Sequence, residues 1–307
     1  MSLLEQGTLA ARSLPAQVSI AAHTLIAQQH GDAAGPHLNG INALFGAGSL
    51  LAPTVHRTLS PTLAAVSPLA SYWVIAAAAS LAALPFLGAM RSSAVITGRG
   101  PSQAQGGQPA RWGRAQLLVI GAAMALVACS VGAENCFGTW LFAYAAQAPG
   151  LGQGCAATAV SLFWSAFTAG RLLAIPASAR LPPATILLAT LPLAVLGPAV
   201  ALLAPSRPLA LFAAAVAAGL GISTGFANSV SLLGRFVPAD SRVQAAVQLA
   251  ATAGSMTFPP AVALIAQRGL LGMEAFLWVA AACAALDFLL VLLLVRAGAR
   301  LLRGGVV

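Results

Sequence analysis

Lysine is absent from the 307-residue chain, and charged side chains of any kind make up only 7% of it. A soluble domain carries about 25% charged residues, so this scarcity of charge excludes a soluble globular protein. The absence of lysine also excludes a phosphate-binding loop that ends in Gly-Lys. Hydrophobic residues make up 59% of the chain, and long runs of them predict an integral, multi-pass membrane protein.

The residue patterns of enzymes are missing too. The sequence contains no GxSxG, no HExxH and no pair of intramembrane aspartates, so it offers no hydrolase or protease set. All four histidines precede residue 57, and no two of them have metal-ligand spacing. The cysteines are scattered, which is typical of small buried side chains: Cys129, Cys136, Cys155 and Cys283. We therefore expect no catalysis, no bound metal and no organic cofactor.

The formal net charge of +9 comes from arginine alone. The arginines lie mostly in short loops between apolar runs, so they indicate membrane topology and not a nucleic-acid partner. Loops on one side hold ten arginines, against three or four on the other. The positive-inside rule then predicts that residues 91–114 and the C-terminus are cytoplasmic.

The apolar runs predict an all-α bundle of about eight or nine transmembrane helices. Residues 1–90 contain two spans, at 38–59 and 69–90, and a short partial span near 15–30. A basic, Gly-rich and Pro-rich linker follows at 91–114. Residues 115–297 then hold six spans, and 298–307 form a tail. The six spans are expected at 115–146, 155–178, 184–204, 209–233, 243–267 and 273–295.

Glu134 and Asn135 interrupt the first of these six spans with adjacent polar side chains. A carboxyl in hydrocarbon costs about 2.5–3.5 kcal/mol on insertion scales, so it usually has a cavity or a partner. The pair is expected either to line a cavity for a polar ligand or coupling ion, or to lie near the outer interface, where water solvates the carboxyl. Counted at about 1.5 Å per residue, Arg171 lies about 12 Å closer to the cytoplasm. A direct Arg171–Glu134 ion pair is therefore not expected. Arg171 is expected to snorkel toward the cytoplasm or to hold a cytoplasmic gate, with Asp287 as a less favoured partner.

A polar stripe runs along one face of the 243–267 span, where Gln244, Gln248 and Thr252 recur every four residues. Amides both donate and accept hydrogen bonds, so this face suits a hydroxyl-rich ligand. Alternatively, the same side chains would form hydrogen bonds between packed helices. For Asn228 and Trp140 the choice between a ligand site and a structural role also stays open. The tryptophan ring, for example, either stacks on a sugar or anchors the helix at the membrane interface.

Six spans behind a basic linker and an incomplete set of spans resemble the major facilitator superfamily. Three stretches carry this resemblance: GINALFGAGSLLAP at 40–53, GRLLAIPASARLPP at 170–183 and GAENCFGTWLFAYA at 132–145. The first looks like a close-packing fifth helix, and the second like the C-terminal copy of the cytoplasmic gating motif. The third resembles the seventh helix of the sodium-dependent glucose transporter-like branch, with fucose permeases as more distant relatives.

The resemblance implies a secondary transporter for a hexose or related sugar, working by rocking of two halves, in the plasma membrane. It implies a cavity lined by Glu134, Asn135, Trp140, Asn228, Gln244 and Gln248, and a cytoplasmic gate at Arg171 and Arg180. It also implies coupling to Na+ or H+ through Glu134, that is, symport.

The front of the chain departs from that pattern, because nothing in it looks like the first three helices. A transporter of this type has its site between two halves. The sequence is therefore expected to be either a truncated product or a non-transporting paralogue that acts as a membrane partner or regulator. In the second case it would form a homo-oligomer or hetero-oligomer in the bilayer.

Overall fold

The computed structural model describes residues 22–27, 29–44, 112–238 and 240–303, and within these ranges it contains helices and turns but no strand. This confirms the all-α membrane bundle. The predicted 69–90 span, nearly all of the 91–114 linker and most of the 40–53 stretch lie outside the described residues. Residues 34–44 form the longest described helical segment before the linker, and they follow a short 3-10 helix, η1 (Gly31–Ala33).

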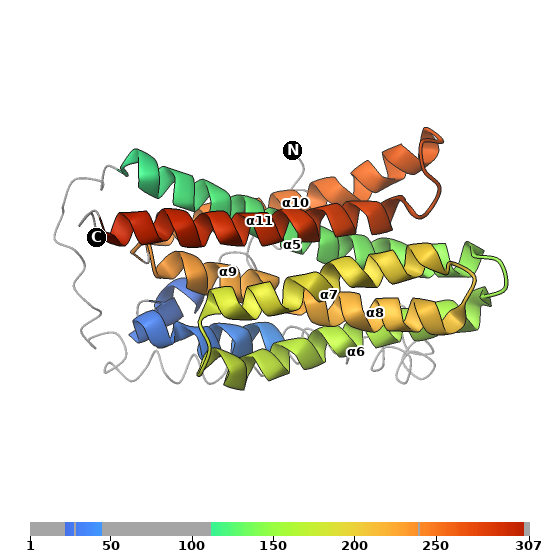
Figure 1. Ribbon diagram of the computed structural model, residues 1–307, viewed down its shortest axis with the longest axis horizontal. Helices are drawn as coiled ribbons and strands as arrows, with labels where there is room; N and C mark the ends of the chain where they lie inside the picture. Colours follow the sequence, from blue (N-terminus) through green and yellow to red (C-terminus); the bar gives the residue numbers. More distant parts are fainter. Residues whose placement is uncertain (1–21, 28, 45–111, 239, 304–307) are drawn as a thin grey trace, which may run out of the picture. The chain divides into compact units, whose positions relative to one another are not determined.

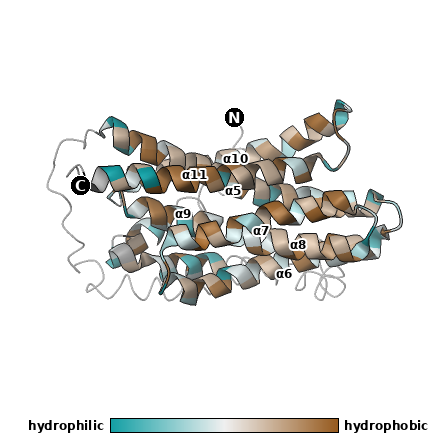
Figure 2. Ribbon diagram, in the orientation of Figure 1, coloured by the Kyte–Doolittle hydropathy of each residue, from teal (hydrophilic) through white to brown (hydrophobic). Residues whose placement is uncertain are grey.

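Six helices of the C-terminal part are long and apolar enough to cross a membrane, as predicted. In chain order the helices are α5 (Arg114–Gln147), α6 (Gly152–Ser178), α7 (Pro183–Leu203), α8 (Pro208–Ser223), α9 (Gly225–Gly234), α10 (Ser241–Gln267) and α11 (Ala275–Arg303). Helices α8 and α9 together make one span. Hydrophobic residues dominate the middles of the helices, and polar residues collect at their ends (Figure 2).

The helices run back and forth through short loops (Figure 1). Helix α5 packs against α10 and α11, α6 packs against α8, and α7 packs against both α8 and α11. Aromatic rings fill the core toward the end with the α5–α6 loop, where Phe137 stacks on Phe163 and meets Phe276 edge to face, and all three are almost completely buried. Aliphatic side chains such as Leu126, Leu187 and Leu294 fill the core toward the C-terminal end of α11.

Glycine allows the closest helix contacts. A Cβ atom on Gly254 of α10 would collide with the backbone carbonyl of Ala128 on α5, and one on Gly221 of α8 would collide with the backbone of Ala194 on α7. Membrane helices associate through such small residues, because lipid supplies no hydrophobic force to bring them together. These contacts fix the spacing of the helices that surround the polar residues.

The predicted 209–233 span is broken at Thr224, which separates α8 from α9. Two side chains contact the break: Asn228 Nδ2 donates at 3.0 Å to the Thr224 carbonyl, which also accepts the Asn228 backbone N–H, and the hydroxyls of Thr224 and Thr190 are 2.8 Å apart. Irregular backbone at membrane depth is tolerated where protein or a water-filled cavity satisfies it. The break marks the depth at which the candidate site lies.

Candidate functional site

A cavity of about 310 Å³ opens among α5, α6, α9, α10 and the helical segments 22–27 and 34–44. Four predicted site residues line it: Glu134, Asn135, Gln248 and Arg171. The other lining residues are mostly polar or aromatic and include His23, Asn42, Trp164, Phe226, Thr252 and Ser255. The structure thus brings together half of the residues that the sequence analysis assigned to the cavity and the gate.

The charged centre of this cavity is an ion pair between Arg171 of α6 and Glu134 of α5. Arg171 Nη2 lies 3.5 Å from Glu134 Oε2, and the side chains are 4% and 13% exposed. The expectation that these residues lie too far apart in depth is wrong. Helix α5 has 34 residues and is therefore about 51 Å long, well above the roughly 30 Å of a hydrocarbon core. Counting from its first residue overstated the depth of Glu134.

Arg171 is held by backbone as well as by charge. Its Nη1 donates to the Asn42 carbonyl at 2.9 Å, and its Nε donates to the Ser223 carbonyl at 3.3 Å. The guanidinium also lies 4.1 Å from the centre of the Phe167 ring, a favourable cation–π geometry. A Cβ atom on the preceding Gly170 would collide with the Ser223 side chain. The Gly-Arg pair of the predicted gating motif therefore lets α6 approach the end of α8.

The polar face of α10 reaches the cavity over part of its length. Gln248, Thr252 and Ser255 line it. Among the described residues, Gln248 Oε1 is buried and has no hydrogen-bond partner. This oxygen is therefore available as an acceptor for a bound ligand.

Three predicted cavity residues lie elsewhere. Trp140 Nε1 donates to the Pro259 carbonyl at 3.1 Å, so it joins α5 to α10. Asn228 is fully buried and its Nδ2 lies 3.5 Å from Asn39 Oδ1, in addition to its bond with Thr224. Gln244 is buried outside the cavity lining. The predicted gate residue Arg180 is exposed in the turn between α6 and α7.

Sequence reasoning missed Trp164, which lies on the cavity in place of Trp140. The signal was available, because Trp164 and Arg171 are seven residues apart on one helix and so share a face. It also missed Asn42 and His23, whose side-chain nitrogens are 3.4 Å apart. No spacing in the sequence links these residues to α6.

The second intramembrane carboxyl, Asp287 of α11, does not pair with Arg171. Its Oδ2 accepts a hydrogen bond from the Ser130 hydroxyl of α5 at 2.7 Å, and the side chain is 1% exposed. Glu134 projects from α5, whereas Asp287 projects from α11 and accepts a bond from α5. The two carboxyls belong to separate polar clusters.

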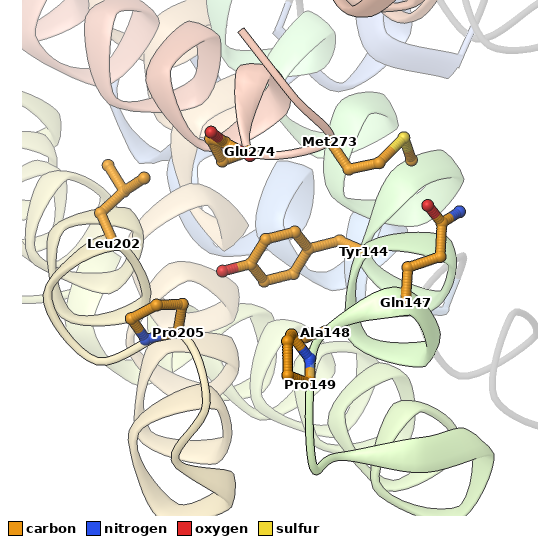
Figure 3. Close-up of a pocket in the computed structure, with 8 residues that line it drawn as sticks. All are labelled: Tyr144, Gln147, Ala148, Pro149, Leu202, Pro205, Met273 and Glu274. Atoms are coloured by element: carbon orange, nitrogen blue, oxygen red, sulfur yellow. The ribbon is translucent and has the colours of Figure 1, made fainter.

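Another cavity, of about 390 Å³, lies where the end of α5 meets the end of α7 and the start of α11 (Figure 3). The Tyr144 hydroxyl points into it, and Glu274 supplies a carboxyl at its edge (Figure 3). Its lining includes no arginine, so it lacks the opposed charges of the Arg171–Glu134 cavity.

Comparisons with known proteins confirm the resemblance seen in the sequence. No family model matches the chain. The sequence is 26% identical over 273 residues to the sodium-dependent glucose transporter 1 of Danio rerio, covering 77% of this chain and 45% of that protein. The chain thus spans about half the length of the curated relative it matches.

Two solved structures have the same fold. One is a variant of the Escherichia coli fucose:proton symporter, with a TM-score of 0.66 and 17% identity. The other is described as a major facilitator superfamily transporter, FucP, in the outward conformation, with a TM-score of 0.67 and 18% identity. Each comparison covers 90% of this chain and 72% of the solved chain. The fold is therefore that of the major facilitator superfamily.

Proposed function

We propose that this chain works as a major facilitator-type secondary transporter, moving a hexose or a related sugar by alternating access. The observation that carries the proposal is the buried Arg171–Glu134 pair, which faces a polar cavity at the break between α8 and α9. Buried charges inside a membrane bundle usually mark substrate or ion pathways. The names of the relatives support a sugar, since they refer to glucose and to fucose.

The cavity has the chemistry that a sugar requires. Sugar hydroxyls donate and accept hydrogen bonds, and Asn135 and Gln248 offer amides that do both. Trp164 adds an aromatic face on the same cavity. A small number of placed polar groups beside aromatic surface is the usual composition of a small-molecule site.

Glu134 is the proposed coupling residue, with Na+ or H+ as the coupling ion. A cation at the carboxylate would compete with Arg171 for Glu134 Oε2 and so weaken the 3.5 Å pair. Arg171 also holds the Asn42 carbonyl, which belongs to the helical segment before the linker. Loss of the pair would therefore loosen a contact between that segment and α6, which is a route from ion binding to the opening of a gate.

The topology and the division into halves belong to the same proposal. The excess of arginine at the C-terminal end of α11 supports a cytoplasmic C-terminus, with Arg180 as part of the cytoplasmic gate. Residues 115–297 would form a complete six-helix half, joined through the 91–114 linker to the incomplete half at 1–90. The same proposal makes the chain a transporter and not an enzyme, acting in the plasma membrane.

Uptake into proteoliposomes tests the proposal directly. The purified chain should take up labelled glucose or fucose above empty vesicles when a Na+ or H+ gradient is imposed. Glu134→Gln should abolish the dependence on the gradient, because the amide cannot exchange a cation. Glu274→Gln is the matched control, since it removes a carboxyl outside the cavity. A folded chain without uptake would refute the proposal and leave the non-transporting partner as the function.

A further inference from the structure

An apolar groove of about 520 Å³ runs between α7 and α11, on a part of the bundle away from the Arg171–Glu134 cavity. Leu191, Val195 and Leu196 line it from α7, and Phe288 and Leu289 line it from α11. Leu196 and Leu289 are 53% and 61% exposed. Exposed leucines on a transmembrane helix face hydrocarbon, so this groove opens to lipid.

One end of the groove leads to positive charge. Helices α7 and α11 run in opposite directions, and Leu187 near the start of α7 packs in the same core cluster as Leu294 near the end of α11. Arg296 and Arg300 follow Leu289 by seven and eleven residues and are exposed. At 3.6 residues per turn, each lies within about 20° of the Leu289 direction. The groove and the two arginines therefore form one continuous stripe on α11.

The distances along α11 match the size of a membrane lipid in one leaflet. Arg296 lies about 10 Å and Arg300 about 16 Å from Leu289 along the helix axis. One leaflet of the hydrocarbon core is about 15 Å thick. A headgroup at the arginines would therefore place its acyl chain beside the groove.

We propose that the α7–α11 groove and the Arg296–Arg300 pair bind an anionic glycerophospholipid from the leaflet at this end of the bundle. The acyl chain lies against Leu196 and Leu289, and the phosphate contacts the two guanidinium groups. Arginine is well suited to this role, because its planar fork matches phosphate geometry. The site requires neither the cavity residues nor sugar transport, so it stands independently of the proposed function.

Native mass spectrometry of the full chain in detergent tests the site, with phosphatidylglycerol and phosphatidylcholine as probes. Wild-type protein should retain phosphatidylglycerol in preference to phosphatidylcholine. The double variant Arg296→Gln/Arg300→Gln should bind phosphatidylglycerol about 30-fold more weakly, at about fivefold per arginine. The matched control Arg207→Gln/Arg268→Gln removes the same charge at the other end of the helices and should keep wild-type affinity.

A second pair of variants tests the groove without touching charge. Leu289→Trp fills the groove and should weaken phosphatidylglycerol binding several-fold, whereas Leu264→Trp, at an exposed position of α10 that is 55% exposed, should not. Equal loss in the two arginine variants would overturn the proposal, because binding would then follow net charge alone. Equal binding of both lipids, or full competition by soluble glycerol phosphate, would overturn it as well.

Discussion

The Arg171–Glu134 pair can be measured by a double-mutant cycle in detergent. Removing one member of a buried ion pair usually costs about 3–5 kcal/mol, because the other charge stays buried and uncompensated. The two single variants should differ in how much stability they lose. Arg171→Gln leaves the Glu134 carboxylate without its cation and also loses the bonds to the Asn42 and Ser223 carbonyls. We expect it to lower the free energy of unfolding by about 3–5 kcal/mol.

Glu134→Gln is the milder change. Arg171 keeps its two backbone acceptors and its contact with the Phe167 ring, so its charge remains partly satisfied. We expect a loss of about 1.5–3 kcal/mol, the range for a hydrogen bond to a charged group. The double variant should then lose less than the sum of the two single variants, with a coupling energy of about 1–3 kcal/mol.

Reversible unfolding in mixed micelles, followed by circular dichroism, supplies the four free energies. Arg180→Gln serves as the control, since this exposed arginine should change stability by no more than about 0.5 kcal/mol. Effects of the single variants that add to within about 0.5 kcal/mol in the double variant would show that the two side chains do not interact. The structural basis of the proposed coupling would then be refuted.

Two further predictions concern the packing of α5. Gly254→Ala should destabilise the bundle by about 1–3 kcal/mol, because the added Cβ meets the Ala128 carbonyl, whereas Gly121→Ala, which meets open space, should be harmless; thermal unfolding of both variants in the same detergent checks this. Ser130→Ala should cost about 1–3 kcal/mol, because Asp287 loses the 2.7 Å bond of its buried carboxyl, while Ser130→Thr keeps the hydroxyl and should recover most of the loss. Equal effects of alanine and threonine at position 130 would contradict a role for this bond.

Most spans of the C-terminal half could be predicted from the sequence to within three residues, but the span predicted at 273–295 is observed as α11 at Ala275–Arg303, so the helix continues into the predicted 298–307 tail. Long apolar runs between short loops leave little choice in a membrane, because every backbone polar group must be bonded within a helix. The predicted 115–146 span is observed as Arg114–Gln147, and the predicted 184–204 span as Pro183–Leu203. The break at Thr224 could not be foreseen, because the contacts made there with other helices, from Thr224 to Thr190 and from the Ser223 carbonyl to Arg171, are tertiary.

The sequence predicted which residues form the candidate site better than it predicted how those residues are arranged in space. Polar side chains are costly in hydrocarbon, so their presence alone identified Glu134, Asn135 and Gln248. Their partners depend on the rotation and relative depth of helices, which an apolar run does not encode. This is why Trp140 was chosen instead of Trp164, and why the contact between Arg171 and Glu134 was excluded.

The helix break and the ion pair belong together physically. A continuous helix at 209–233 would bond its carbonyls internally, but the Ser223 carbonyl at the end of α8 accepts the Nε–H of Arg171 instead. Other donors of the same guanidinium contact the Asn42 carbonyl and Glu134, and the proposed transport cycle would have to exchange these two contacts. Arg171 thus contacts the backbone of α8 on one side and the carboxylate of Glu134, at the cavity, on the other. The proposed coupling requires such an arrangement, because an ion that binds Glu134 would weaken one contact of Arg171 and leave its bond to α8 in place.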